Sequence, residues 1–373
     1  MASTSSSTSA DASNRLDKLL EPVLALDNVS DIHITEGQPI WARLNGALVA
    51  LDTPNVSDAA IVGLIKHKAH ETGVSYEAVE KSMAIKGDED LGFSLSGSRL
   101  RANVFRSNGR QLSMTIRKIP SEAPQLELLG VPPSYVATVQ QAKGLVLVTG
   151  STGSGKSTTL ASTISHLNNT LDGHIITIED PIEYVIPSRR CLVHQRQIRR
   201  DTTDFKGSLR AAMRQDPDVI LVGELRDQET VKTALDAANT GHLVFATLHT
   251  MSARQSIERL LSFFPTDARE YVNSVLSQVL LCVLSQSLLK SRDGKGRVLA
   301  AELLINTNAV RAAIRDSKPA ALFNAMDTGA KEGQVLLNAA LKELVRRQKV
   351  TREEALYYAY DPAGLMKELG GSR

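Results

Sequence analysis

The sequence predicts a two-domain α/β protein, with a parallel sheet in the larger domain and a smaller α+β domain before it. In the second half, continuous apolar runs at 145–148, 175–178, 219–222 and 243–248 are separated by helix-length segments. Strands that are apolar on both faces are typical of a parallel sheet covered by helices. The first third has shorter, mixed runs with turn signals between them, and four prolines between 120 and 133 separate the two parts.

The N-terminal part divides into a tail and a small domain. Eight of the first thirteen residues are Ser or Thr, so we expect 1–13 to be a disordered tail. An amphipathic segment at 15–24 opens the domain at 14–120. Asn45-Gly46 is a strong hairpin signal, because both residues tolerate a positive φ. Asn108-Gly109 likewise separates two expected strands, 99–106 and 110–119.

The proline cluster predicts a semi-rigid linker at 121–142, followed by the second domain at 143–373. Beyond about residue 263 the sequence pattern predicts a mainly helical C-terminal part. The longest nearly apolar stretch, 275–289, is interrupted by polar residues and is too short to cross a bilayer.

Composition narrows the class of protein. Among 373 residues, 43 are Lys or Arg and 41 are Asp or Glu, so the net charge of +2 is too close to zero for a strong nucleic-acid footprint. The two cysteines, Cys191 and Cys282, cannot form a four-cysteine zinc site or a disulfide framework. No apolar run of signal-peptide length opens the chain. We therefore expect a soluble protein of the reducing cytosol.

A phosphate-binding motif follows the first apolar strand of the second domain. The segment 150–157 reads Gly-Ser-Thr-Gly-Ser-Gly-Lys-Ser, which is G-x-x-x-x-G-K-[ST] between an expected strand at 144–149 and an expected helix at 158–167. Backbone N–H groups of such a loop surround phosphate oxygens, Lys156 reaches the β and γ phosphates, and Ser157 ligates Mg²⁺. The alternative is a glycine-rich turn with a solvated lysine. The predicted ATP-binding residues are Gly150, Ser151, Thr152, Gly153, Ser154, Gly155, Lys156, Ser157 and Thr158.

Acidic side chains follow the next two strands, and a histidine follows the fourth. Glu179 and Glu183 follow the run at 175–178, and Glu224 follows the run at 219–222. Ligands in parallel α/β folds bind at the carboxyl ends of strands, so these acids are expected near the phosphate loop. The alternatives are a helix cap or a surface salt bridge between Glu224 and Arg226. His249, at the end of 243–248, is either a packing residue or part of the same edge.

Three segments together resemble the secretion ATPase family, and most closely its PilT-type branch, the retraction motors of type IV pili. Residues 176–183 resemble the family's Asp box, 214–227 its Walker B region and 240–250 its His box. The similarity extends from about residue 30 to the C-terminus. The resemblance implies a PAS-like first domain and a RecA-like ATPase domain, assembled as a ring of six that binds ATP and Mg²⁺ between domains and between neighbours.

The resemblance also implies roles for individual residues. Glu179 would be the general base or water-positioning acid, Glu224 would act through the magnesium shell with Ser157, and His249 would sense the γ phosphate. Segments 99–106 and 117–120 resemble those that supply arginines to the nucleotide, namely Arg101 and Arg117, a role that suits a planar, permanently charged donor. The alternative is a basic, solvated sheet face.

Two further features bear on the branch and its partners. The chain lacks the four-cysteine zinc insert of assembly motors, and 309–318 resembles the retraction-linked motif AIRNLIREGK, with departures at Ala312, Ala313, Asp316 and Ser317. The implied partner is an inner-membrane pilus platform protein, reached from the cytoplasmic side without a membrane anchor in this chain.

Other functions remain open at this point. A secretion ATPase of the DotB-like branch and a pilus assembly motor share the same motifs. A nucleic-acid translocase is disfavoured, because the charge is −3 over 1–142 and +5 over 143–373 and aromatics are few. A regulator that binds nucleotide without turnover would not need the acids. Five arginines between 189 and 200 predict a solvated hairpin face or a surface for the ring's pore or an acidic partner.

Overall fold

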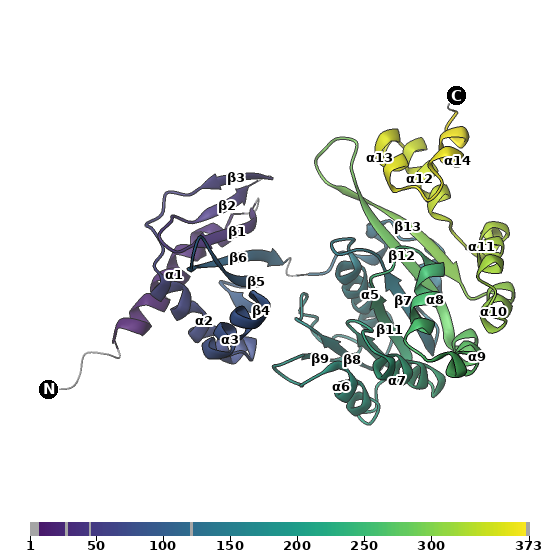
Figure 1. Ribbon diagram of the computed structural model, residues 1–373, viewed down its shortest axis with the longest axis horizontal. Helices are drawn as coiled ribbons and strands as arrows, with labels where there is room; N and C mark the ends of the chain where they lie inside the picture. The colour runs from purple at the N-terminus through teal and green to yellow at the C-terminus, as the bar shows by residue number, and fades with distance from the viewer. Residues whose placement is uncertain (1–6, 27–28, 45, 120–121, 371–373) are drawn as a thin grey trace. The chain divides into compact units, whose positions relative to one another are not determined.

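The computed structural model describes residues 7–26, 29–44, 46–119 and 122–370. Backbone contacts divide the chain into two compact units. The first unit contains Met1–Glu122 together with two later segments, Asp180–Val185 and Arg196–Asp204. The second contains Ala123–Glu179, Ile186–Gln195 and Phe205–Arg373. Figure 1 traces both from the N-terminus in purple to the C-terminus in yellow.

In its described residues, the first unit is an antiparallel sheet with three helices. Its strands have the spatial order β3-β2-β1-β6-β5-β4, and every neighbouring pair is antiparallel. The elements are α1 (Ser7–Leu24), β1 (Val29–Thr35), β2 (Trp41–Leu44), β3 (Ala47–Ala50), α2 (Asp58–Thr72), α3 (Tyr76–Lys86), β4 (Asp88–Leu95), β5 (Ser98–Ser107) and β6 (Gln111–Ile119).

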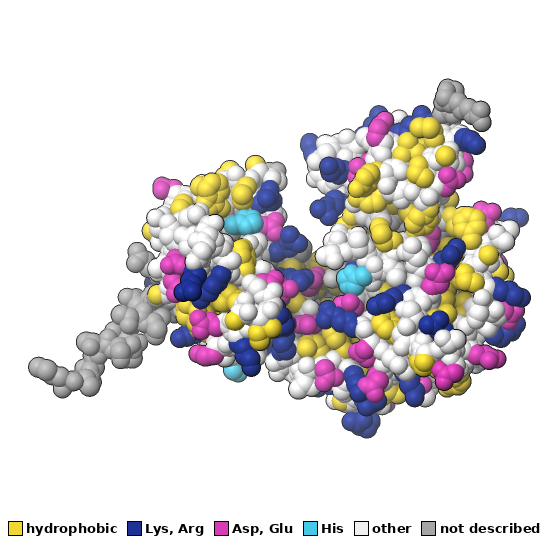
Figure 2. Space-filling model, viewed as in Figure 1, with side chains coloured by type: hydrophobic (Ala, Val, Ile, Leu, Met, Phe, Trp, Pro, Cys, Tyr) yellow, Lys and Arg dark blue, Asp and Glu magenta, His cyan; other side chains and the backbone are white. Residues whose placement is uncertain are grey.

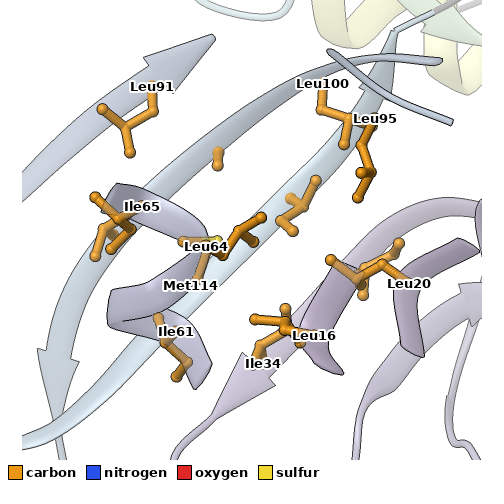
Figure 3. Packing of buried hydrophobic residues seen from close by; sticks show 14 of the residues in the cluster. Leu16, Leu20, Ile34, Ile61, Leu64, Ile65, Leu91, Leu95, Leu100 and Met114 are labelled. Atoms are coloured by element: carbon orange, nitrogen blue, oxygen red, sulfur yellow. The ribbon is translucent and has the colours of Figure 1, made fainter. Parts of the chain in front are cut away.

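The core of this unit lies between the helices and one sheet face. Leu16 and Leu20 of α1, with Ile61 of α2, point toward Ile34 and Met114 of the sheet (Figure 3). All five are almost fully buried. Strand residues alternate between this core and the opposite face, which is the period of two that a half-covered sheet requires.

Several expectations for the N-terminal part can be compared with the structure. β2 and β3 pair with Leu44 opposite Ala47, as the hairpin signal predicted; Asn45 itself lies outside the described residues. The strands expected at 99–106 and 110–119 are confirmed as β5 and β6. Residues 1–6 of the expected tail lie outside the described residues, but 7–13 belong to α1. Backbone hydrogen bonds can extend the amphipathic 15–24 segment toward the N-terminus without requiring apolar side chains.

The second unit is built on a seven-stranded sheet in the order β13-β12-β7-β11-β10-β8-β9. β12, β7, β11, β10 and β8 are parallel, and β13 is antiparallel to β12. The strands are β7 (Gly144–Thr149), β8 (His174–Glu179), β9 (Leu192–Gln197), β10 (Val219–Val222), β11 (Leu243–Leu248), β12 (Leu280–Lys290) and β13 (Arg297–Ile305). β7, β10 and β11 are buried along their whole length, which confirms the covered parallel sheet.

Helices of this unit connect the strands and form its C-terminal part. They are η1 (Leu126–Leu129), α4 (Pro133–Thr138), α5 (Lys156–Thr170), α6 (Phe205–Ala212), α7 (Gln228–Asn239), α8 (Ala253–Ser262), η2 (Thr266–Ala268), α9 (Arg269–Val279), α10 (Asn308–Arg315), α11 (Pro319–Thr328), η3 (Ala330–Glu332), α12 (Leu337–Arg346), α13 (Arg352–Tyr358) and α14 (Pro362–Glu368). Among the described residues, no helix combines the length and apolarity needed to cross a membrane.

The structure differs from the sequence-based expectation in two places within this unit. The mainly helical part expected after residue 263 contains the long β12–β13 hairpin, because a short apolar run has no periodicity that separates a buried strand from a buried helix. The segment expected as a linker, 121–142, holds η1 and α4. Leu126, Tyr135 and Val139 from this segment are buried in the core of the second unit, so from Ala123 on it belongs to that unit.

Candidate nucleotide site

The phosphate loop connects the end of β7 to the start of α5. Three of its glycines have positive φ: +141° at Gly150, +79° at Gly153 and +91° at Gly155. A Cβ atom at Gly150 would lie 2.4 Å from the carbonyl oxygen of Gln286, so only glycine fits there without displacing backbone. Lys156 donates from Nζ to the carbonyl oxygens of Gly150 (2.7 Å) and Ser151 (3.0 Å). The loop therefore curls around its own lysine.

Polar residues of β12 form hydrogen bonds with residues on both sides of this loop. Ser285 and Thr149 are joined through their hydroxyls at 2.8 Å, and Gln286 donates from Nε2 to Thr159 Oγ1 of α5 at 2.8 Å. All four side chains are buried. The sequence reasoning did not assign Ser285 and Gln286 to the site, although their polarity within the apolar stretch 275–289 was a usable signal.

The strand register brings the other predicted residues of the second unit to the same edge of the sheet. Ile178 of β8 lies opposite Val222 of β10, and Leu248 of β11 lies opposite Thr149 of β7. Because these strands are parallel, the residues that follow them, Glu179, Glu224, His249 and the phosphate loop, all lie at the carboxyl edge. This arrangement confirms the placement expected from the sequence.

Hydrogen bonds orient the carboxylate of Glu179. Its Oε1 accepts from the hydroxyl of Thr177 at 2.6 Å and from Nε2 of Gln195 at 3.2 Å. Thr177 lies two residues earlier on the same strand, and Gln195 lies on β9. A carboxylate held by hydrogen bonds in this way keeps a defined direction, which is the property that a water-positioning acid needs.

Glu224 stands between two basic side chains. Its Oε1 lies 3.3 Å from Nε2 of His249, and its Oε2 accepts from Nε of Arg226 at 2.7 Å. The salt bridge with Arg226 is the alternative that the sequence left open, and it is present. Because the other oxygen faces His249, the structure also joins Glu224 to the end of β11 and thereby links the two predicted motifs.

Arg101 and Arg117 belong to the first unit, where they lie opposite one another on β5 and β6. Arg101 forms 3.0 Å ion pairs with Asp90 and Glu183, and Arg117 Nε lies 2.8 Å from Oδ1 of Asp31. Burial alone would lower the pKa of Arg101, but its hydrogen bonds and charge interactions with the two acids raise it. Both arginines are thus charged groups on one sheet face, with carboxylate partners.

Ion pairs hold part of the basic segment at 189–200. Arg190 forms a bidentate salt bridge with the carboxylate of Asp172, and Arg199 forms ion pairs with Glu89 and Asp180. Arg189 donates to the side-chain oxygen of Asn169 at 3.1 Å. Three of the five arginines are therefore paired with carboxylates, namely Arg190, Arg199 and Arg200, the last with Asp201 at 3.6 Å.

No group of three or more His, Cys, Asp and Glu side chains in the described part of the chain is arranged to hold a metal ion. A divalent cation here would depend on Ser157, Glu224 and oxygen atoms of a bound phosphate. Ser157 fits this role, since it lies exposed in the first turn of α5, directly after Lys156. Oxygen ligands supplemented by substrate phosphates are the usual environment of Mg²⁺.

The fold and this edge of the sheet define a nucleotide-binding ATPase of the RecA-like class with a smaller N-terminal α+β domain. Residues 10–357 match the family described as type II/IV secretion system protein, and the chain belongs to that family. It is 42% identical to the type IV pilus retraction ATPase PilT of Pseudomonas aeruginosa, over 89% of this chain and 94% of the relative. It is 40% identical to a twitching motility protein of Neisseria gonorrhoeae, over 89% of both.

Solved structures agree with this assignment. The crystal structure of the pilus retraction motor PilT with bound ADP matches with a TM-score of 0.81 at 41% identity, covering 94% of this chain and 98% of the other. The ATPase DotB of Legionella pneumophila matches with a TM-score of 0.80 at 28% identity, covering 94% and 96%. The resemblance to the PilT-type branch is confirmed, and the chain is a PilT-type ATPase.

Proposed function

We propose that this chain is a Mg²⁺-dependent motor that hydrolyses ATP to retract type IV pili. It works as a ring of six at the inner face of the cytoplasmic membrane and acts on a membrane-embedded pilus platform protein. The observation that carries the proposal is the meeting of the phosphate loop, Glu179, Glu224 and His249 at one edge of four parallel strands. Identity of about 40% to a retraction ATPase and to a twitching motility protein supports the pilus as the client.

The phosphate loop supplies binding energy and charge compensation. Its glycines let backbone N–H groups turn toward phosphate oxygens, and the N-terminus of α5 adds a partial positive charge. Lys156 is already held over the loop by two carbonyl oxygens, so its ammonium group is positioned before phosphate arrives. Mg²⁺, when bound by Ser157 and through the shell of Glu224, would compensate negative charge on the phosphates.

The acids and the histidine divide the remaining work. Glu179, oriented by Thr177 and Gln195, aligns the attacking water and accepts its proton. Glu224 is oriented by Arg226 and His249. A γ phosphate near His249 would compete with Glu224 for the imidazole, which gives the histidine a physical means of sensing nucleotide.

Arg101 and Arg117 are proposed to bind phosphate oxygens during the catalytic cycle. In the structure each guanidinium is paired with carboxylates, so binding phosphate exchanges one anionic partner for another rather than requiring a bare charge. Such an exchange costs less than desolvating an unpaired guanidinium. The two residues face the same side of the sheet and can act on one ligand together.

Substitution of the loop lysine tests the ATPase site. Lys156→Ala should abolish ATP hydrolysis, because it removes the cation that meets the β and γ phosphates. Lys143→Ala is the matched control, since Lys143 is exposed and immediately precedes β7, at its opposite end from the phosphate loop. Normal hydrolysis by Lys156→Ala, in a preparation free of contaminating ATPases, would contradict the assignment.

The direction of movement has its own test. The chain is also similar to the ATPase DotB and to a pilus assembly ATPase. A secretion system and pilus assembly are therefore the alternative clients. Deletion of the gene followed by electron microscopy of the cell surface separates these clients. Excess pili are expected for a retraction motor, whereas absent pili would indicate assembly and unchanged pili a different secretion client.

A further inference from the structure

Glu302 is a buried carboxylate that the mechanism above does not use. It lies on β13 opposite Ser285 of β12, and its side chain is only 4% exposed. Burial raises the pKa of this carboxyl to about 7, even though the backbone N–H groups of Ala253 and Leu337 act in the opposite direction. A group that is costly to bury and remains in the core calls for a structural or functional reason.

The carboxylate of Glu302 lies at the N-terminal ends of two helices. Its Oε1 accepts from the backbone N–H of Ala253, the first residue of α8, at 2.7 Å. It also interacts with the backbone N–H of Leu337, the first residue of α12. The N-cap of α12 is Leu336, which has no side-chain oxygen to offer. Glu302 therefore supplies an acceptor for the first N–H of α8 and faces the positive ends of both helix dipoles.

A second contact connects the same two regions. The hydroxyl of Tyr360, between α13 and α14, donates to the carbonyl oxygen of Met251. Asn338 of α12 holds Tyr360 in turn, accepting from its backbone N–H at 3.2 Å, and donates to the carbonyl of Asp361 at 3.0 Å. The loop at 249–252 is thus held at Met251 by Tyr360, while α8, which follows it directly, is held at Ala253 by Glu302.

This loop begins with His249, whose imidazole faces Glu224 at 3.3 Å. We propose that Glu302 and Tyr360 are positioning residues that hold the 249–252 loop, so that the C-terminal helices α12–α14 set the placement of His249 at the nucleotide edge. The inference rests on the proposed role of His249. It connects the C-terminal helices to the nucleotide edge, so a partner that shifts these helices would shift His249. Apolar side chains gather on the surface of these helices in Figure 2.

A purely structural role for Glu302 and Tyr360 predicts a different experimental result from a positioning role. If Glu302 and Tyr360 only stabilise the fold, their substitution lowers the melting temperature and leaves the turnover of folded protein unchanged. If they position His249, turnover falls while nucleotide affinity, which depends on the phosphate loop, is kept. Tyr360 is the cleaner probe, because its ring is half exposed and Tyr360→Phe removes a single hydroxyl.

The experiment compares full-length variants for kcat, for KM of ATP and for melting temperature. Tyr360→Phe should lower kcat roughly tenfold with little change in KM, as expected when a catalytic group is misplaced. Glu302→Ala should lower kcat further, and Glu302→Gln should restore most of it by keeping an acceptor for the two helix ends. Asp218→Asn is the control, because Asp218 also accepts a backbone N–H, from His174 at 2.8 Å, at the opposite end of the sheet from the 249–252 loop. Wild-type kcat in Tyr360→Phe would overturn the proposal.

The path through His249 is tested by combining substitutions. In a His249→Ala background, Tyr360→Phe should have no further effect on kcat, because the group that it positions is gone. An equal tenfold loss in both backgrounds would overturn the inference. Wild-type turnover of His249→Ala alone would instead remove the proposed role of His249, so the two failures are distinguishable.

Discussion

Glu179 ends β8, Glu224 follows the neighbouring strand β10, and hydrogen bonds orient each carboxylate. Thr177 and Gln195 donate to Glu179, while Arg226 donates to Glu224, which also faces His249. Both carboxylates therefore have fixed directions, which suits the proposed alignment of water by Glu179 and the proposed action of Glu224 through the magnesium shell.

Amide substitutions should separate binding from chemistry at these two positions. Glu179→Gln and Glu224→Gln keep the shape of the side chain but remove its charge, so nucleotide binding should survive while kcat falls at least ~100-fold. Glu258→Gln on α8 serves as the control, since its carboxylate pairs with Arg254 on the helix surface. Binding measured with a fluorescent nucleotide, beside steady-state hydrolysis, gives both quantities. A variant that hydrolyses ATP normally would disprove the role of its glutamate.

Glu302 should make stability depend on pH. Because burial raises its pKa from 4.5 to about 7, the folded state binds the proton more tightly than the unfolded state. Its contribution to stability is therefore greatest below pH 4.5 and is lost as the pH rises through about 7. The nearby Tyr360 stays protonated across this window, since burial and the charge of Glu302 raise its pKa.

The measurement compares melting temperatures of the wild type and Glu302→Gln across this window. The variant cannot lose a proton, so its stability relative to the wild type should increase with pH, by on the order of 3 kcal/mol at most. Parallel curves for the two proteins would show that the carboxyl titrates normally in the folded state.

The phosphate loop depends on backbone conformations with positive φ, which glycine adopts without strain. Gly150→Ala should destabilise the fold and abolish nucleotide binding, because the new Cβ would lie 2.4 Å from the carbonyl oxygen of Gln286. Gly294→Ala is a matched control: Gly294 also has positive φ, at +71°, but no atom lies within 4 Å of its ideal Cβ. The control should lose only about 1 kcal/mol and bind nucleotide normally. Equal behaviour of the two variants would argue against steric exclusion at Gly150.

The central strands were predictable because their sequence signal is local. β7, β8, β10 and β11 are largely apolar, and glycine, acids or histidine lie at or directly after their carboxyl ends. The parallel sheet and the composition of its edge therefore follow from pattern and spacing. The hairpin β12–β13 was missed, since an apolar run beside helical segments carries no strand period of its own. Its pairing with β7 depends on contacts distant in sequence.

The role of Arg99 shows another limit of sequence reasoning. The segment 99–106 was expected to supply arginines to nucleotide, but Arg99 is only 7% exposed and donates to the carbonyl of Ile182 and to the side chain of Gln197. It anchors the segments Asp180–Val185 and Arg196–Asp204 within the first unit. A contact with a backbone carbonyl more than eighty positions away leaves no trace in residue type or spacing.

The proposed catalytic groups are divided between the two units. The phosphate loop, Glu179, Glu224 and His249 belong to the second, and Arg101 and Arg117 belong to the first. A site that needs groups from two bodies works only in the conformations and assemblies that bring them together, and such dependence is how binding energy is converted into movement. Turnover should therefore depend on both the arginines and assembly.

Arg101→Ala and Arg117→Ala test this dependence. Each arginine is substantially exposed, at 41% and 69% of its side chain, so its removal should change stability little. Turnover should nevertheless fall, roughly 100-fold, because charge compensation in the transition state is lost. Lys118→Ala, next to Arg117 on β6, is the control. A drop in melting temperature that matches the drop in activity would point to folding rather than to catalysis.

Assembly provides the final test, because a site completed by a neighbouring chain obeys mass action. The ATPase rate per wild-type chain should rise with protein concentration as hexamers form, and light scattering on the same dilution series should show the mass rising in parallel. Adding an excess of Arg101→Ala chains should lower the rate per wild-type chain, since mixed rings contain incomplete sites. If the activity per chain stays constant in samples shown to be monomeric, each chain carries a complete site, and the ring mechanism must be abandoned even though the ATPase assignment survives.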